Sequence, residues 1–313
     1  MKGNYMWSNF AVVAGQVFIL FILIAVGFFS GKFGLINRTG AKYLTDVVLY
    51  LATPCIMVQS FQKVGFSSEL MLNLGICFVC AVAIQVLSIF LSRAIFRDKD
   101  KSRRIVMRFS AVFSNCGFMS LPLQRAILGD KGVFYGTVFV AVFNILVWSY
   151  GLLDMSGDKK SFTIKKILLN PGIIGAVFAA ALFFLRIQLP EIILSPIEYI
   201  AALNMPLPML VIGFYLTRFK IKKYIGDLGV YAVCAVRLLL IPCLSLLIMK
   251  LLSVNGDIVT ACTVAASSPV AATTTMFATK FRRDVELSVG LVSMTTLMSI
   301  ITMPLIIAAA QTF

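Results

Sequence analysis

Hydrophobic residues of this chain occur in long, nearly continuous runs that are separated by short polar segments. Most runs are close to the roughly 20 residues that a helix needs to cross about 30 Å of hydrocarbon. Strands of a transmembrane barrel would instead alternate polar and apolar residues over about ten positions. The pattern therefore predicts an all-α integral membrane protein with ten transmembrane helices, at residues 10–30, 41–62, 69–96, 104–127, 132–154, 168–185, 194–217, 226–251, 256–280 and 286–309.

The composition agrees with a membrane protein. Of the 313 residues, 60% are hydrophobic and only 13% are charged, and the mean hydropathy is +0.96. Soluble globular domains are about 45–50% apolar and about 25% charged. The first run has only Lys2 before it, is long for a signal peptide and lacks a clear small-x-small cleavage site. We therefore expect it to be retained as the first helix.

Basic residues are distributed unevenly between the two sets of loops. The formal net charge is +15, and 21 of the 28 Lys and Arg residues lie in alternate loops, against 6 in the opposite loops. Because basic loops stay in the cytoplasm, we predict a multi-pass protein of the cell (plasma) membrane with both termini extracytoplasmic. We predict no nucleic-acid partner, because the pattern contains no soluble domain to bind one. The basic loops contain Lys32, Arg38 and Lys42; Arg93, Arg97, Lys99, Lys101, Arg103, Arg104 and Arg108; Lys159, Lys160, Lys165 and Lys166; Arg218, Lys220, Lys222 and Lys223; and Lys280, Arg282 and Arg283.

The ten runs divide into two halves of five. An odd number of spans in each half means that the second half enters the membrane from the opposite side, which is the inverted repeat of many secondary transporters. We therefore predict a first five-helix repeat at 1–155, a cytoplasmic connecting loop at 156–167 and a second, inverted five-helix repeat at 168–313.

The fourth run of each half contains residues that oppose a continuous helix. In the fourth span these are Ser114 to Pro122, and in the ninth they are Ser267 to Pro269, followed by Thr273 to Thr275. A lipid-facing helix should not be broken at mid-depth, because its freed N–H and C=O groups would find no water. Paired breaks at corresponding positions are the best sequence indication of a transporter's substrate site.

The breaks have two possible interpretations, one functional and one structural. A broken helix presents the positive N-terminal end of a half-helix, which favours an anion such as a carboxylate. Gly117 tolerates unusual backbone angles, while Ser114, Asn115 and Ser120 can bond the freed backbone or a ligand. The alternative is a pair of ordinary proline kinks whose backbone groups are satisfied by Ser and Thr side chains.

Four further polar residues lie inside the apolar runs. Arg237, in the eighth run, should face the interior or a wet cavity, where it would attract an anionic substrate or act as a structural counter-charge. Asp46 follows Lys42 by four residues, which is typical of a surface ion pair, with a coupling carboxylate as the alternative. Asn144 and Asn204 would line the cavity or bond a neighbouring helix.

The sequence lacks the residues that several kinds of catalytic site require. The chain has no histidine, which excludes a His proton relay, a Ser-His-Asp triad and a His-ligated metal. It has no Walker A sequence and no G-x-G-x-x-G, which argues against ATP-driven transport by this chain. Cys77 and Cys80 form an isolated C-x-x-C, and all 7 cysteines lie in predicted spans, where we expect them to pack as small apolar residues. We therefore predict no enzyme activity, no cofactor and no metal site.

Short motifs occur along the whole chain in a recognisable order: Gly27 to Leu35, Leu51 to Pro54, Asn115 to Pro122, Asn170-Pro171, Pro206 to Pro208 with Ile212-Gly213, and Ser268-Pro269 followed by Phe277 to Phe281 and Asp284. Together they resemble the auxin efflux carrier family, within the bile acid/sodium symporter-like superfamily. Asn115 to Pro122 is similar to the family's N-x-x-x-x-G-x-P crossover pattern, with Ser120 where Gly is usual. The long hydrophilic loop of plant carriers is absent.

The resemblance implies ten helices in two inverted repeats, with the fourth and ninth helices broken and crossing. It implies a transport domain that moves against a scaffold of the first, second, sixth and seventh helices. It also implies carriage of organic anions, which are indole-3-acetate in plant members and malate or malonate in some bacterial ones. Asn115 matches the crossover Asn that contacts substrate, and Pro122 and Pro269 match helix-break positions.

These observations lead to one hypothesis with two alternatives. We predict a secondary active transporter, a permease or efflux carrier of small organic anions, that works in the lipid bilayer by an elevator-type mechanism. The alternatives are a sodium-coupled organic-anion symporter of the same fold and a non-transporting membrane sensor. Coupling to H⁺ or Na⁺ and a homodimer are left open. The candidate substrate-binding residues are Ser114, Asn115, Gly117, Ser120, Pro122, Asn144, Arg237, Ser267, Ser268, Pro269 and Thr273.

Overall fold

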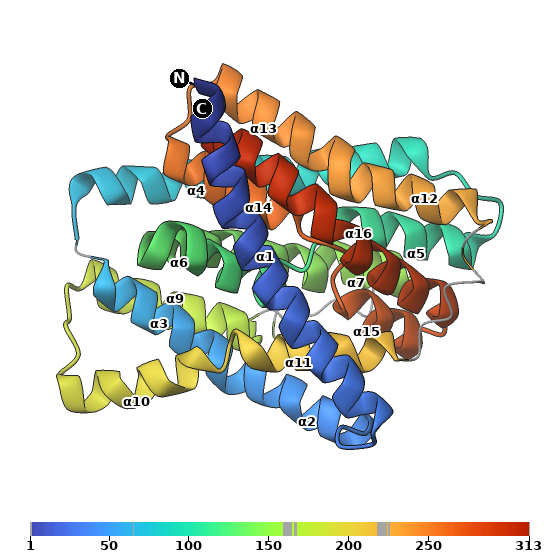
Figure 1. The fold of residues 1–313 in the computed structure, drawn as a ribbon, viewed down its shortest axis with the longest axis horizontal. Helices are drawn as coiled ribbons and strands as arrows, with labels where there is room; N and C mark the ends of the chain where they lie inside the picture. The colour runs from blue at the N-terminus through green and yellow to red at the C-terminus, as the bar shows by residue number, and fades with distance from the viewer. Residues whose placement is uncertain are drawn as a thin grey trace.

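The computed structural model describes residues 2–64, 66–158, 165, 168–217, 224 and 226–312, and their regular structure is helical (Figure 1). No β-strand occurs among these residues. Seven helical stretches in them are long and apolar enough to cross a membrane, which confirms the prediction of an all-helical, multi-pass membrane protein. The stretches are Val13–Lys32, Arg38–Lys63, Ser68–Ile95, Cys116–Ser156, Glu191–Leu216, Leu228–Leu251 and Val285–Gln311, with shorter apolar helices at Pro171–Phe184 and Gly256–Ser267.

The helices follow the predicted runs, and several runs are divided between two helices. The first half contains α1 (Lys2–Lys32), α2 (Arg38–Val47), α3 (Thr53–Lys63), α4 (Ser68–Ile95), α5 (Lys101–Val112), α6 (Leu121–Leu146) and α7 (Leu152–Ser156). The second half contains α9 (Pro171–Phe184), α10 (Glu191–Ala202), α11 (Pro206–Leu216), α12 (Leu228–Ala235), α13 (Ile241–Leu251), α14 (Gly256–Ser267), α15 (Thr273–Lys280) and α16 (Val285–Gln311).

Side chains cap most of the helices that begin near the ends of the molecule. Each cap accepts a hydrogen bond from a main-chain N–H that the first helical turn leaves without an acceptor. These starts are therefore determined by local sequence. The capping residues are Asn37, Ser67, Asp100, Asn170, Asp227, Asn255 and Asp284.

Wider, π-helical turns precede three prolines at the same spacing. They are Val48–Ala52 before Pro54, Cys116–Ser120 before Pro122 and Val236–Leu240 before Pro242. Proline lacks the N–H that would bond four residues back, and its ring crowds that carbonyl. A wider turn accommodates both effects without ending the helix. Pro122 therefore lies in the first turn of α6 rather than in the unwound segment, which is shorter than the predicted Ser114 to Pro122.

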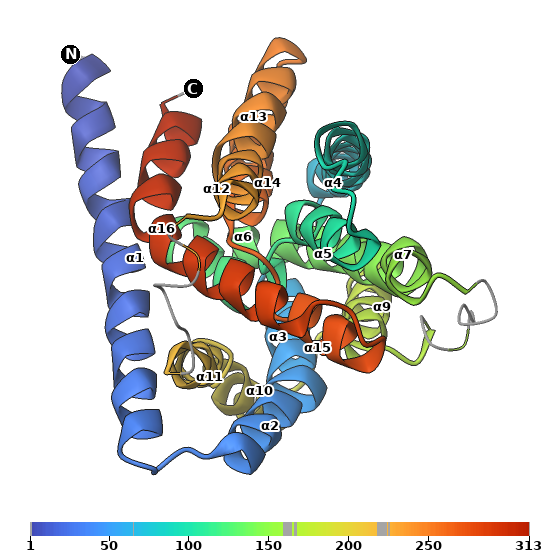
Figure 2. The same cartoon turned by 90° about the vertical axis from the view of Figure 1, so that its right-hand side faces the viewer.

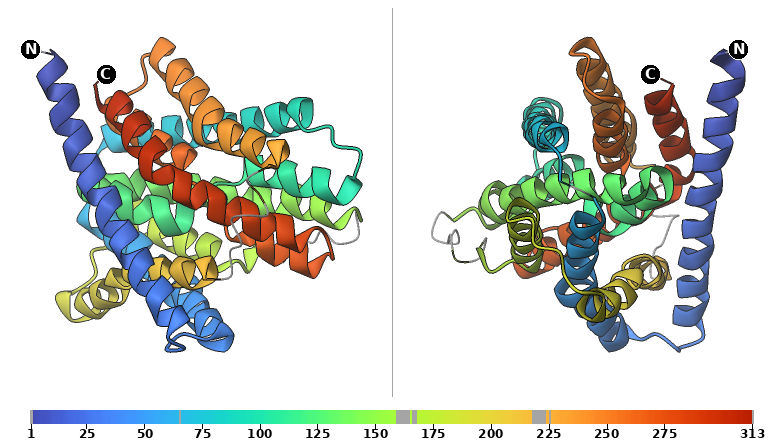
Figure 3. Two further views of the ribbon diagram at one scale, coloured as in Figure 1. Left: turned by 45° about the vertical axis from the view of Figure 1, so that its right-hand side comes forward. Right: turned by 90° about the vertical axis from the view of Figure 1, so that its left-hand side faces the viewer.

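Helix α1 lies on the outside of the molecule, where it contacts α11 along one part and α16 along another (Figures 2 and 3). Both termini lie toward the same side of the molecule, at the start of α1 and the end of α16 (Figures 1 and 2). Glycines allow α1 and α11 to touch, because a Cβ atom at Gly213 would overlap the main chain of Ile24 and Gly27. A similar contact joins α9 to α3, where a Cβ atom at Gly175 would lie 2.8 Å from the Cα atom of Pro54.

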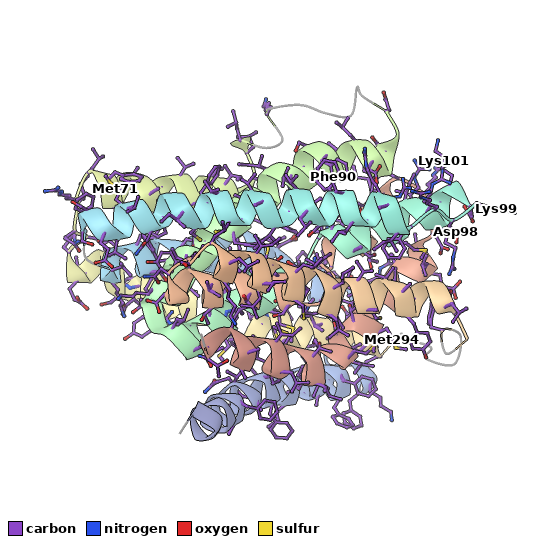
Figure 4. All side chains as sticks on the ribbon, turned by 90° about the horizontal axis from the view of Figure 1, so that it is seen from above. Met71, Phe90, Asp98, Lys99, Lys101 and Met294 are labelled. Atoms are coloured by element: carbon purple, nitrogen blue, oxygen red, sulfur yellow. The ribbon has the colours of Figure 1, made fainter. Side chains whose placement is uncertain are left out.

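Basic residues of two predicted loops, at 93–108 and 280–283, lie at one end of the molecule. Figure 4 shows Lys99 at the end of α4 opposite to Met71. At that end, Arg103 donates to Asp227 at 2.6 Å, and Arg283 donates from Nε to the Met155 carbonyl at 2.8 Å. These contacts bring together the starts of α5, α12 and α16 and the end of α7. The predicted connecting loop at 156–167, apart from residues 156–158 and 165, and the basic residues at 218–223 lie outside the described residues.

Candidate functional site

The two predicted breaks meet. Helix α5 ends at Val112 and α14 ends at Ser267, and the extended segments that follow them pair in antiparallel fashion at Ser114 and Val270. The Asn115 N–H donates to the Pro269 carbonyl at 2.7 Å, and the Ala271 N–H donates to the Phe113 carbonyl at 2.9 Å. Helical structure resumes at Cys116 in one segment and at Thr273 in the other. We call residues 113–120 and 268–275 the crossing.

Local sequence explains why each segment leaves the helix. Ser268 precedes a proline, and its backbone is extended at φ −63° and ψ 148°, because the proline ring disfavours the helical conformation at the preceding residue. Asn115 has φ −77° and ψ 52°, which is not helical. The two extended segments satisfy part of each other's backbone, as a non-helical chain inside a membrane protein requires.

The helices that start at the crossing lack side-chain caps. Neither Asn115 before the π-turn Cys116–Ser120 nor Ala272 before α15 makes a capping hydrogen bond with its side chain. In the first turn of α15, the N–H groups of Thr274 and Thr275 donate to the carbonyls of Ala271 and Ala272 at 3.0 and 3.2 Å, so neither helix start is closed by a side-chain acceptor. Nearby, the hydroxyls of Ser120, Thr273 and Thr274 are buried and have no hydrogen-bond partner among the described residues. The crossing thus combines two positive helix ends with donors that are not used.

Part of the crossing is exposed. Gly117, Phe118 and Thr273 are partly exposed, whereas Ser114 and Ser268 are buried. A Cβ atom at Gly117 would have no heavy atom within 4 Å, so there is open space beside the first turn of that helix. This open space lies beside one of the two uncapped helix ends.

Arg237 belongs to the other ends of the broken helices. Its Nη1 donates to the carbonyls of Ala111 and Val112, both at 3.0 Å, and its Nη2 donates to the Ala266 carbonyl. These carbonyls lie at the C-terminal ends of α5 and α14. The side chain is only 1% exposed, and no carboxylate pairs with it within the described ranges. The contacts therefore make Arg237 a shared C-terminal cap for both broken helices.

The remaining candidates have different surroundings. The hydroxyls of Ser267 and Ser268 donate to the Val264 carbonyl, at 3.3 and 2.9 Å, so they satisfy the last turn of α14. Asn144 donates to the Val140 carbonyl of its own helix at 3.0 Å and lies against Gly172 at the start of α9. Its contacts are therefore with α6 and α9 and not with the crossing. The structure brings the other candidates to the crossing or its flanks.

Sequence reasoning missed two residues, one of which bonds the crossing and the other the helix that leads into it. The Thr295 hydroxyl on α16 accepts a hydrogen bond from the Val270 N–H at 3.1 Å. The Gln124 amide on α6 is fully buried and donates to the Ala261 carbonyl of α14 at 2.7 Å. Gln124 could have been found in the sequence as a polar residue in an apolar run that is followed by Gly132 and Gly136, against which it packs. Nothing in the sequence distinguishes Thr295 from its polar neighbours on α16.

Two cavities lie away from the crossing, near the ends of helices. A cavity of about 110 Å³ is lined by Arg103, Tyr224, Asp227, Asp284, Glu286 and Leu287. The hydrogen bond from Arg103 lowers the pKa of Asp227, while burial and nearby acids raise the pKa of Tyr224 to about 12. A second cavity of about 480 Å³ lies at the opposite end, lined by Lys250, Ser253, Val254, Gly256 and Val259.

Known proteins match this chain along most of its length. The family model described as membrane transport protein matches residues 12–165 and 159–307. An uncharacterized transporter of Methanocaldococcus jannaschii is 26% identical over 302 residues, which cover 92% of this chain and 96% of the relative. An uncharacterized transporter of Methanothermobacter thermautotrophicus is 24% identical over 294 residues, which cover 92% of this chain and 95% of the relative.

Proposed function

This chain belongs to the membrane transport protein family, the auxin efflux carrier-like group that its motifs resemble, and from that premise we propose that it is a secondary active transporter of small organic anions, in particular carboxylates. Family membership establishes a multi-pass membrane transporter, with a substrate and a lipid environment. The proposal adds the substrate class, the site and the mechanism. The observation that supports it is the pairing of the two helix breaks, each followed by an uncapped helix N-terminus.

Charge explains why an anion suits the crossing. Each helix N-terminus carries roughly +0.5 of an elementary charge, so two of them together balance about one carboxylate. The field acts with little screening, because the crossing is largely buried. The Asn115 amide and the hydroxyls of Thr273 and Thr274 would donate hydrogen bonds to the bound carboxylate. Ser114, Gly117, Ser120, Ser267, Ser268, Pro122 and Pro269 would shape the site around it.

The wider architecture in this proposal is ten spans in two inverted repeats, 1–155 and 168–313, in the cell membrane with both termini extracytoplasmic. Packing supports the symmetry. The first span contacts the seventh, as α1 against α11, and the sixth contacts the second, as α9 against α3. These two pairs would exchange under an inverted repeat.

In the proposed elevator, α1–α3 and α9–α11 form the scaffold, and the other helices carry the crossing. The two groups meet where α3 and α9 contact α6 and where α1 contacts α16. Among the described residues, Arg125 of α6 makes a polar contact between the groups, since it donates to the Gln59 side chain of α3 at 2.6 Å. A contact of this kind between the groups must break when one group moves past the other. The protein then needs no catalytic residues and no cofactor.

The test uses purified protein in two steps. Mono- and dicarboxylates are first screened for their effect on the thermal unfolding midpoint, and those that stabilise the protein are then used in uptake assays with proteoliposomes. Asn115→Ala should lower transport by about 10- to 100-fold, because a hydrogen bond to a charged group contributes about 1.5–3 kcal/mol. Asn73→Ala removes a buried Asn of α4, away from the crossing, and serves as the matched control.

Each result tests a different part of the proposal. Equal transport by Asn115→Ala and the unmodified protein would overturn the site. Stabilisation by a carboxylate without any uptake would favour the sensor alternative. No stabilisation and no uptake with any carboxylate would overturn the substrate class.

A further inference from the structure

We propose that the guanidinium of Arg237 is a built-in cation, which takes the position of a coupling cation at the crossing, so that this carrier works without Na⁺. The part that concerns transport rests on the proposed function. The part that concerns charge at the crossing rests only on the contacts of Arg237 and is tested separately.

All three acceptors of Arg237 are main-chain carbonyls at helix ends. Ala111 and Val112 end α5, and Ala266 lies in the last turn of α14. In transporters with broken helices, the C-terminal ends of half-helices and unwound carbonyls are the groups that coordinate Na⁺. In this chain the same kind of group, on both broken helices, is bonded to one guanidinium.

The charges balance without any other ion. Each helix C-terminus carries roughly −0.5 of an elementary charge, so the ends of α5 and α14 together offset the single positive charge of Arg237. No carboxylate pairs with Arg237 in the part of the chain that the structure describes, so the helix ends are its counter-charge. The positive N-terminal ends at the crossing then remain unbalanced, and an anion is the ligand that would balance them.

The shape of the side chain suits this position better than a lysine would. A guanidinium presents several N–H groups in a rigid plane, whereas an ammonium is a point charge. Nη1 and Nη2 of Arg237 reach different helices, so one side chain joins both C-terminal ends. Arg237 lies in the π-turn Val236–Leu240, and π-turns occur frequently at functional sites.

The first experiment needs no substrate. Thermal unfolding of the unmodified protein, Arg237→Lys and Arg237→Gln is measured in NaCl and in choline chloride at equal ionic strength. For the unmodified protein, the unfolding midpoint should be the same in NaCl and in choline chloride. The same should hold for Arg237→Lys, which keeps a fixed cation. Arg237→Gln should unfold at a lower temperature, and NaCl should raise its midpoint by about 2–4 °C over choline chloride, because Na⁺ would bind the uncovered carbonyls. An equal loss of stability in both salts would overturn the proposal, because it would make Arg237 a structural cap only.

The second experiment measures carboxylate uptake by the unmodified protein with and without a Na⁺ gradient. Equal rates are expected, and a requirement for Na⁺ would overturn the proposal even if Arg237→Gln yields no folded protein. Failure to transport any carboxylate would overturn the proposed function, while the unfolding experiment would still decide the role of Arg237.

Discussion

Two places in this protein bring main chains from distant parts of the sequence into contact, and they do so by opposite means. Where α1 meets α11, the contact is made by apolar packing over glycines, and a Cβ atom at Gly27 or Gly213 would overlap the opposite backbone. At the crossing, the contact is made by hydrogen bonds between extended segments, with Asn115 and Ala271 as donors.

The two contacts differ in the hydrogen-bonding groups that each leaves without a partner. Helices α1 and α11 keep their backbone bonds within themselves, so their main chains leave no N–H or C=O group for a ligand at this contact. The crossing leaves two helix ends uncapped and several hydroxyls unpaired, which is costly inside a protein unless a ligand or water compensates. The first contact is therefore suited to a rigid frame, and the second is suited to binding.

The largest effect is expected from a substitution that disrupts the glycine contact between α1 and α11. Gly213→Leu forces a side chain into the backbone of α1, and overpacking of this kind costs about 1–3 kcal/mol or more. We expect a sharp loss of folded protein by size-exclusion chromatography and a lower unfolding midpoint. Gly15→Ala is the control on α1, because its Cβ would have nothing within 4 Å. It should leave stability unchanged or raise it by up to about 1 kcal/mol. Equal behaviour of the two variants would contradict the close contact.

The second prediction concerns a substitution that fills the open space beside the crossing. Gly117→Val should raise the KM for a transported carboxylate by about 10-fold or more, since the new side chain occupies open space next to an uncapped helix end. The unfolding midpoint should change little, because no heavy atom lies within 4 Å of the new Cβ. Gly75→Val on α4, which also has nothing within 4 Å, should leave KM unchanged. A loss of stability with KM unchanged would show that this space is not part of the site.

The smallest effect is expected outside both regions, at the ion pair between α5 and α12. Arg103 lowers the pKa of Asp227 in the folded protein, so this carboxylate stabilises the fold above its unfolded pKa, about 3.9, and the contribution is lost as pH falls through the lower folded value. Asp227→Asn removes the charge and keeps an oxygen for the N-terminus of α12. The stability difference between the two proteins, at most about 1 kcal/mol at pH 7, should shrink below about pH 4 in thermal unfolding. A difference independent of pH would contradict this role for the pair.

Much of the fold follows from local sequence. The apolar runs predict the helices because a chain in hydrocarbon must satisfy its own backbone, and a helix does so within one segment. Helix caps and helix breaks also depend on neighbouring residues, so they can be located in the sequence. Examples are the caps Asn170 and Asp284 and the breaks at Asn115 and Pro269. The prediction placed Pro122 in the unwound segment, although a π-turn accommodates it inside the helix.

The candidate site was predicted only in part. The residue types and spacing of Ser114, Asn115, Pro269 and Thr273 indicated two breaks, and the family resemblance implied that they cross. Arg237 was proposed as a ligand for substrate or as a structural charge, and sequence could not choose, because its acceptors are carbonyls of residues more than 25 positions away.

The sequence by itself determined which segments form apolar helices, where many of these helices start and where two of them break, because these depend on neighbours along the chain. Only the tertiary structure decided that the two breaks pair, that one arginine closes both helix ends and that glycines join α1 to α11. The reason is physical: a hydrogen bond or a close contact depends on distance in space, and residues such as Ala111 and Arg237 become neighbours only when the whole bundle is folded.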